Sequence, residues 1–163
     1  MIAWGELEST APLIADAGRR LLRLNEVAFL ATVSSTGRPR LHPFVPRVVD
    51  RRLIAFIMND SPKIKDLRER HQFSIHTLPG AEDEEFYVSG YAIEIATDPD
   101  LRARAADAMG FATGVDSNHV LFEFLFDRAL HTEWLDFGTA SHRPSRNIWL
   151  LKGDPSMRTH NDA

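Results

Sequence analysis

The stretch "FLATVSSTGRPRLHPFVP", Phe29 to Pro46, decides which fold the sequence predicts. It begins with β-branched and aromatic residues, continues into the turn-forming run "SSTG", and then alternates again with a period of two. This pattern predicts two antiparallel strands joined by a hairpin. Pro43 and Pro46 have no N–H to donate to a β-ladder, so the second strand is expected at a sheet edge or at a bulge. Two interpretations follow: an edge strand protected from aggregation, or a strand whose backbone faces a ligand.

Further segments with strand character lie on both sides of this hairpin, and the connections between them are too short for helical crossovers. Gly90 marks a bulge or a close backbone approach within one of them. Arg47 falls on the apolar parity of its strand, so it either extends past the core to solvent or marks a shift in register. Strands are predicted over residues 26–34, 38–49, 53–58, 72–78, 86–96, 119–137 and 148–152. Helices are predicted over residues 10–25, 59–71 and 97–112, with Thr10 and Asp98 as the caps of the first and the last. The sequence therefore predicts a small antiparallel barrel with peripheral helices.

The composition is that of one globular domain. The chain has 163 residues, of which 44% are hydrophobic, and it contains no cysteine. We expect a single domain over residues 1–163, with a helix at 10–25, a barrel over 27–152 and a flexible tail over 153–163. The first residues lack a secretory signal, and the apolar runs are too short to span a membrane, so a cytoplasmic protein without a membrane partner is expected. The formal charge of −4 argues against a nucleic-acid partner.

Lys63 is the residue whose charge most needs an explanation. Ser61 is a good N-cap and Pro62 suits the first helical position, so Lys63 is expected in the first turn of a helix. The positive end of the helix dipole makes a cation unfavourable there. A bound phosphate would reverse this, because the backbone N–H groups, the Ser61 hydroxyl and the Lys63 ammonium would all face an anion. The alternative is a solvated surface lysine.

Patterns for other chemistries are missing from the sequence. The seven histidines show no HExxH motif, and without cysteines no thiolate ligand is available, so no metal site is expected. The sequence has no phosphate-binding Walker loop, no GxGxxG motif and no GxSxG elbow. We assign no catalytic residue.

The order of these signals is similar to that of the pyridoxamine 5′-phosphate oxidase-like family, the FMN-binding split β-barrels. The similarity runs from about Leu21 to Ile95, and its diagnostic parts are the Thr–Gly–Pro turn with its strand and the "SPK" helix start at Ser61. The resemblance implies an antiparallel split β-barrel of six or seven strands with three helices. It also implies a homodimer with FMN bound at the dimer interface, acting on a small-molecule substrate or electron donor.

The resemblance also implies which residues hold the cofactor. Four consecutive residues match the strand along the flavin ring, a basic residue ends that strand, two residues match contacts on the next strand, and two match the phosphate-binding helix start. A residue at a ring edge and a late tryptophan, which reaches the ligand or a partner subunit, complete the set. In chain order these are His42, Pro43, Phe44, Val45, Arg47, Ile57, Met58, Ser61, Lys63, Glu85 and Trp149.

The sequence also departs from the family pattern. His42 stands where the oxidase has an arginine. The oxidase's C-terminal substrate-phosphate motif is not found, and His142, Arg143 and Arg146 match it only remotely. Vitamin B6 oxidation is therefore not expected. The leading hypothesis is an FMN-dependent oxidoreductase with an unknown substrate. The alternatives are a non-catalytic binder of flavin, deazaflavin F420 or haem on the same fold, and a small-barrel nucleic-acid module that uses the arginines between residues 38 and 52.

Overall fold

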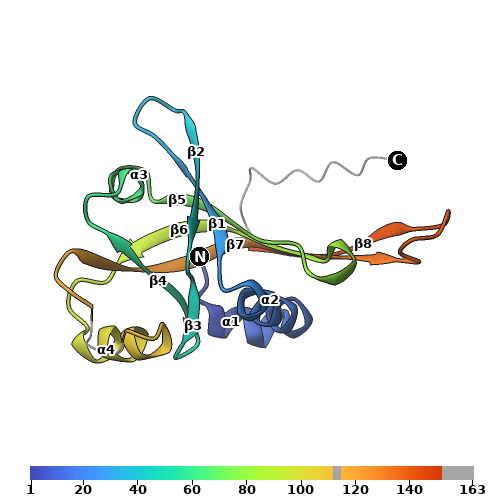
Figure 1. Cartoon of the computed structure of the whole chain (residues 1–163), viewed down its shortest axis with the longest axis horizontal. Coiled ribbons are helices and arrows are strands. Elements are labelled where there is room, and N and C mark those ends of the chain that lie inside the picture. The colour runs from blue at the N-terminus through green and yellow to red at the C-terminus, as the bar shows by residue number, and fades with distance from the viewer. Residues whose placement is uncertain (112–114, 152–163) are drawn as a thin grey trace.

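One antiparallel sheet organises the chain (Figure 1). The structure is a computed structural model that describes residues 1–111 and 115–151. These residues form one sheet of eight strands and four α-helices outside it. The helices are α1 (Trp4–Thr10), α2 (Pro12–Asn25), α3 (Pro62–Arg70) and α4 (Pro99–Ala108), with a short 3-10 turn, η1 (Ala81–Asp83). The strands are β1 (Ala28–Val33), β2 (Pro39–Phe44), β3 (Arg47–Val49), β4 (Arg52–Met58), β5 (Gln72–Thr77), β6 (Glu85–Glu94), β7 (His119–Leu135) and β8 (Arg143–Leu150). The predicted tail over residues 153–163 and the last residue of the predicted barrel, 152, lie outside the described residues.

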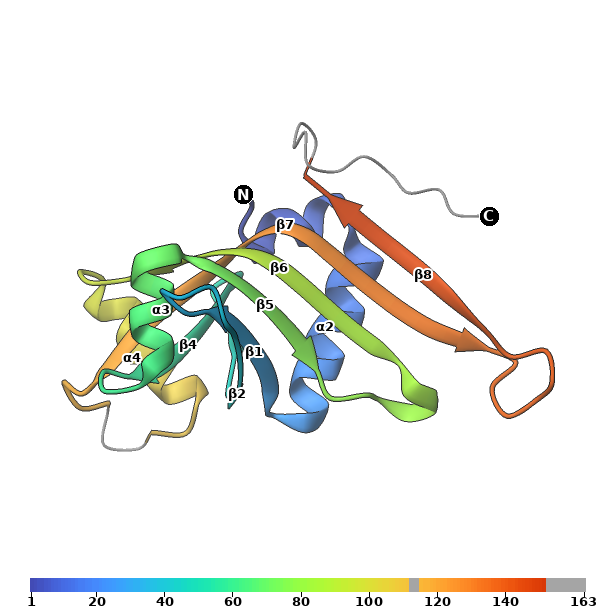
Figure 2. The same cartoon turned by 90° about the horizontal axis from the view of Figure 1, so that it is seen from above.

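The strand order is β2-β1-β5-β6-β7-β4-β3, and β8 also pairs with β7. The long strand β7 causes this branching: its first half pairs with β4, from Met58 opposite His119, and its second half pairs with β8, from Leu150 opposite Arg128. Strand β6 pairs along the other edge of β7. Figure 2 shows β8 and the end of β7 extending away from β4. The sheet is thus split along β7, which confirms the predicted fold class.

The two outer strands of this order, β2 and β3, are consecutive in the sequence. Only Val45 and Pro46 separate them, so the chain crosses from one edge of the curled sheet to the other in two residues. The sequence predicted one strand over residues 38–49, and the structure divides it here because a proline cannot continue the ladder. Arg47 begins a new strand, which explains why it falls on the apolar parity of the preceding one.

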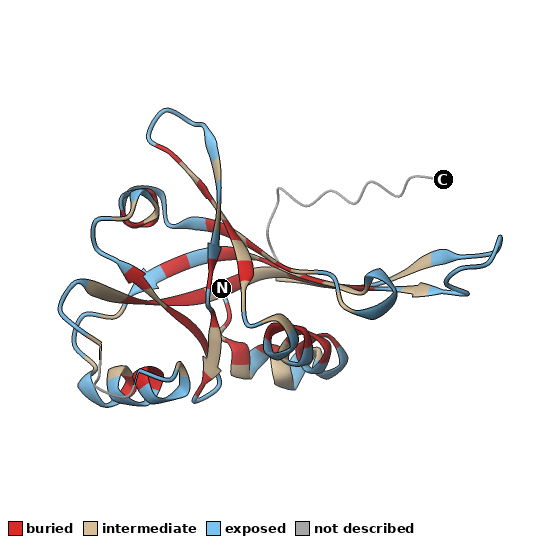
Figure 3. Cartoon of the chain, in the orientation of Figure 1, coloured by how far each residue is buried: buried red, intermediate tan, exposed pale blue. Residues whose placement is uncertain are grey.

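The main core is formed by buried residues of α1, α2 and α3 and of most strands, and Figure 3 shows these buried positions in red. Phe124 packs edge-to-face against Phe44 and Phe73, with ring centroids 5.7 and 4.9 Å apart. Trp4 is fully buried against Phe86, at a centroid distance of 5.9 Å. Burial of this tryptophan stabilises α1, a helix that the sequence did not predict. Helix α1 is the reason why the structure has four α-helices and not the predicted three.

The structure confirms the predicted helix cap at Asp98 and the predicted bulge at Gly90, but not the predicted cap at Thr10. Asp98 caps α4 by accepting a hydrogen bond from Leu101 N at 2.9 Å. Thr10, the predicted cap of α2, instead ends α1, and its hydroxyl donates to the Glu6 carbonyl at 2.8 Å. The register of β6 against β7 shifts between Ser89 and Gly90, as expected for a bulge. A Cβ at Gly90 would lie 1.9 Å from the Leu125 carbonyl oxygen, so glycine is required there.

Among the helices in residues 1–111 and 115–151, none combines the length and apolar character needed to cross a membrane.

Candidate functional site

A cavity of about 320 Å³ lies between the end of β2, strand β4, the start of α3, the end of α4 and the start of β7. It is formed by segments that are far apart in the sequence. Ten residues line it: Phe44, Val45, Phe56, Ile57, Met58, Ser61, Lys63, Met109, Phe111 and His119. The structure thus brings together six of the predicted site residues: Phe44, Val45, Ile57, Met58, Ser61 and Lys63.

The walls of the cavity are mainly apolar. Phe44 and Ile57 are buried in the core, whereas Met58 is 48% exposed. Phe56 meets Phe111 edge-to-face at a centroid distance of 6.0 Å, and the Arg102 guanidinium lies 5.0 Å from the centre of the Phe56 ring. These contacts fix the aromatic wall that α4 and β4 share, and they leave an apolar surface suited to a flat ligand.

The polar end of the cavity is the first turn of α3. Lys63 is half-buried, and its Nζ donates to the Pro43 carbonyl at 3.3 Å. Burial lowers the pKa of Lys63. No carboxylate of the described residues lies within ion-pair distance of this ammonium. Ser61 is the N-cap residue, and its side chain makes no cap hydrogen bond to the helix. The cation and the helix start therefore present donors without an anion, an arrangement that fits a phosphate group.

His42 and Pro43 lie on β2 beside this end of the cavity. The Nε2 atom of His42 is buried and has no hydrogen-bond partner among the described residues. Burial lowers the pKa of His42, and the positive charges of Lys63 and Arg40 lower it further, while Asp66 opposes them. Pro43 contributes its backbone carbonyl as the acceptor for Lys63. Burial and the nearby positive charges therefore both favour the neutral imidazole.

Besides His42 and Pro43, three more predicted site residues lie outside the cavity lining. Arg47 donates to the carbonyls of Glu26 and Pro46, at 3.1 and 3.0 Å. Glu85 is the first residue of β6, opposite the second half of β7, and Trp149 lies on β8 and packs against the core. A contact between these residues and a cofactor stays a prediction.

The sequence did not identify His119 as part of the site. Its Nδ1 lies 2.6 Å from an Asp116 carboxylate oxygen, and this hydrogen bond lowers the pKa of Asp116. The carbonyl of His119 accepts a hydrogen bond from Arg102 Nη2 at 2.9 Å. A carboxylate only accepts hydrogen bonds, so Nδ1 donates in this contact. Met109 and Phe111 were missed as well, because only the tertiary structure brings the end of α4 against β4.

Most arginines between residues 38 and 52 are held by carboxylates of the same chain. The pairs are Arg40 with Asp66, Arg47 with Glu26, Arg51 with Glu8, and Arg52 with Glu123. These pairs reduce the positive charge available to a phosphate backbone. In residues 1–111 and 115–151, no group of three or more metal-ligating side chains comes together.

Among the comparisons with known proteins, only the comparison with solved structures finds matches, and these matches support the fold. No protein-family model and no curated protein matches the sequence. A haem-binding protein from Mycobacterium smegmatis matches with a TM-score of 0.62 and 18% identity, over 81% of this chain. This chain spans 57% of the length of that protein.

Two further structures match over most of both chains. One is a Clostridium acetobutylicum protein of the pyridoxinephosphate oxidase family, related to general stress protein 26, with a TM-score of 0.62, 8% identity, and coverage of 86% of this chain and 95% of that one. The other is PhzG from Burkholderia lata, in complex with tetrahydrophenazine-1-carboxylic acid, with a TM-score of 0.57, 17% identity, and coverage of 91% and 92%.

The fold and the cavity together define a split β-barrel whose apolar pocket ends at a cationic helix start. This is the fold of the pyridoxamine 5′-phosphate oxidase-like proteins, as the sequence resemblance implied.

Proposed function

We propose that this chain is an FMN-dependent oxidoreductase that binds the flavin phosphate at the first turn of α3. The observation that carries the proposal is Lys63, a half-buried ammonium at the start of a helix with no carboxylate partner in the described part of the chain. A cation is unfavourable at this end of a helix unless an anion binds beside it.

The residues of the cavity fit the two chemically different parts of FMN. Lys63 Nζ, the Ser61 hydroxyl and the backbone N–H of Lys63 would hold the phosphate. The apolar side chains of Val45, Met58 and Phe111 would cover the ring and exclude water. When bound, FMN supplies the hydride-transfer chemistry, and the protein contributes binding, orientation and electrostatics.

A second copy of the chain would complete the site. Val45, Met58 and Phe111 are 39, 48 and 40% exposed although they line the cavity, and Leu41, on β2 itself, is 65% exposed. Apolar surface of this kind at a cavity mouth favours a partner that covers it. We infer a homodimer in which the partner covers the open side of the cavity.

Reconstitution with cofactor tests the proposal. Purified protein is denatured to release any bound cofactor, and a refolded or cofactor-free sample is titrated with FMN, riboflavin, F420 and haemin in turn. The expected result is that FMN binds more tightly than riboflavin and is reduced by a chemical or enzymatic donor in its bound form. Failure to bind added FMN contradicts the proposal. Bound FMN that no donor reduces productively favours the alternative of a non-catalytic flavin-binding protein.

Haem binding is a second candidate, and His119 is the observation that favours it. Its Nδ1 is held by Asp116, and Nε2 remains for a ligand, which is the usual arrangement of a metal-binding histidine and its supporting carboxylate. One structural neighbour is described as a haem-binding protein. Haemin titration of the wild type and of His119→Ala, with His142→Ala as the control, tests this candidate. A Soret band that is the same in all three proteins contradicts ligation by His119.

A further inference from the structure

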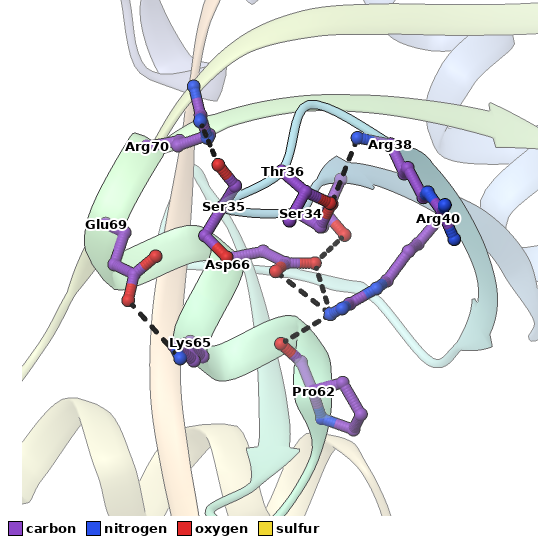
Figure 4. A network of polar contacts seen from close by, with 11 residues as sticks. Ser34, Ser35, Thr36, Arg38, Arg40, Pro62, Lys65, Asp66, Glu69 and Arg70 are labelled. Atoms are coloured by element: carbon purple, nitrogen blue, oxygen red, sulfur yellow. Dashed lines mark hydrogen bonds and ion pairs between the residues drawn. The ribbon is translucent and has the colours of Figure 1, made fainter.

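Three polar side chains of α3, spaced about one turn apart, contact the β1–β2 hairpin: Lys63, Asp66 and Arg70. Lys63 contacts the Pro43 carbonyl at 3.3 Å, and Arg70, two turns further on, donates to the Ser35 carbonyl at 2.8 Å. Asp66 lies between them in the sequence at helical spacing, and Figure 4 shows Asp66 and Arg70 both directed toward the hairpin. These contacts set where the first turn of α3 lies against the hairpin, and thus where Lys63 meets the cavity.

Asp66 is the centre of this contact. It is only 2% exposed, and its carboxylate accepts a hydrogen bond from the Thr32 hydroxyl at 2.8 Å. Arg40 Nη1 donates to both carboxylate oxygens, at 3.0 and 3.1 Å. Thr32 and Arg40 are direct cross-strand partners in β1 and β2, so one buried carboxylate holds both strands.

Arg40 also reaches the start of the helix directly. The same Nη1 atom lies 3.5 Å from the carbonyl of Pro62, the residue immediately before Lys63 (Figure 4). The rest of the helix has separate attachments: Leu67 is buried in the core, and Arg68 forms an ion pair with Glu94 on β6. In the first turn, Ile64 is also buried, so loss of the Arg40–Asp66 pair would loosen the polar side of this turn, where Lys63 lies, and leave the rest of the helix attached.

We propose that Arg40 and Asp66 are positioning residues that hold the first turn of α3 over the cavity and thereby set its preference for a phosphorylated ligand over the same ligand without phosphate. Neither residue lines the cavity. They act through the placement of Lys63 and Ser61, because a charge-assisted hydrogen bond to an anion depends on where its donor lies. The inference rests on the proposed phosphate site at Lys63.

Two substitutions and one matched control test the inference. Asp66→Asn keeps the size of the side chain and removes its charge, and Arg40→Gln removes the other partner from a position that is more exposed and safer for folding. Arg68→Gln is the control, because it breaks an ion pair of the same helix that faces β6 instead of the hairpin. Circular dichroism melts establish that each variant is folded at the assay temperature.

The first measurement compares the dissociation constants for FMN and riboflavin. For Asp66→Asn and Arg40→Gln we expect FMN to bind about tenfold more weakly and riboflavin to change less than about twofold, because only the phosphate contacts depend on the first turn. Arg68→Gln should leave the FMN-to-riboflavin ratio unchanged. Equal weakening of both ligands, or the same loss of preference in Arg68→Gln, would overturn the inference.

The second measurement does not need a cofactor. Amide hydrogen exchange in the first turn of α3, whose Ile64 N–H donates to the Ser61 carbonyl at 3.0 Å, should be about tenfold faster in Asp66→Asn and Arg40→Gln than in the wild type or in Arg68→Gln. Unchanged exchange there overturns the positioning role. A wild-type protein that binds no FMN contradicts the proposed function, and the exchange result then decides the positioning role alone. The two failures are thus distinguishable.

Discussion

Replacing Lys63 with glutamine separates the charge of the side chain from its other contacts. The ammonium is lost, while an amide N–H2 group that can still donate a hydrogen bond is kept. A hydrogen bond to a charged group contributes about 1.5–3 kcal/mol. Lys63 is only half-buried, so the lower part of this range, about 1.5–2 kcal/mol, is appropriate, which corresponds to a roughly ten- to thirtyfold weaker binding of FMN.

Desolvation does not reduce this figure much. Burial already lowers the pKa of Lys63 in the free protein, so part of the cost of removing its ammonium from water is present before the phosphate arrives. An arriving dianion favours the charged form of the lysine, and its affinity should fall as salt concentration rises.

Fluorescence titration with FMN and riboflavin at a fixed salt concentration measures the effect. Lys65→Gln is the matched control, because Lys65 belongs to the same helix, is exposed, and pairs with Glu69 away from the cavity. We expect Lys63→Gln to weaken FMN roughly ten- to thirtyfold and riboflavin less than about twofold, with Lys65→Gln close to the wild type for both ligands. Equal losses for FMN and riboflavin, or an equal effect of Lys65→Gln, would refute the phosphate role of Lys63.

Three further predictions concern stability and assembly. Gly90→Ala should destabilise the fold by about 3 kcal/mol or more in urea unfolding, since its Cβ would lie 1.9 Å from a backbone oxygen, while Gly37→Ala, with open space around it, should cost only about 1–2 kcal/mol; similar costs would contradict the bulge geometry. The hydrogen bond from Arg20 holds the pKa of Glu84 below its ordinary value of 4.5, so the stability this pair contributes is present above that pH and lost as the pH falls through the lowered pKa. Arg20→Gln should therefore lower the melting temperature more at pH 7 than under acid conditions, and an equal loss at every pH would contradict the pairing. Leu41→Asp should convert the inferred dimer to a monomer on a sizing column, and an unchanged elution volume would show that this face is not the interface.

Local chemistry made several elements predictable. Pro62 at the first position of α3, Asp98 as the cap of α4, and Gly90 at the bulge each follow from backbone geometry that involves only nearby residues. Helix α1 was not predictable in this way. Its stability depends on the burial of Trp4 against Phe86, a residue far along the chain.

The candidate site likewise contains residues that the sequence could identify and residues that only the tertiary structure brings together. Lys63 could be identified from the sequence because its charge conflicts with the helix end on which it lies. His119 could not, since its place in the cavity depends on the pairing of β4 with β7, which sets it opposite Met58. Phe111 likewise enters the site only because α4 packs beside β4, where its ring meets Phe56.

The sequence by itself determined most of the strands, the proline-marked hairpin and the cationic helix start, because each depends on neighbouring residues and on side-chain periodicity. The tertiary structure alone decided that Pro46 divides one predicted strand into β2 and β3, and that the chain there crosses between opposite edges of the sheet. It also decided that the end of α4 and the start of β7 complete the cavity begun by β2, β4 and α3. The physical reason is that strand pairing and core packing join residues far apart in the chain, and their free energy appears only when these strands and helices pack together.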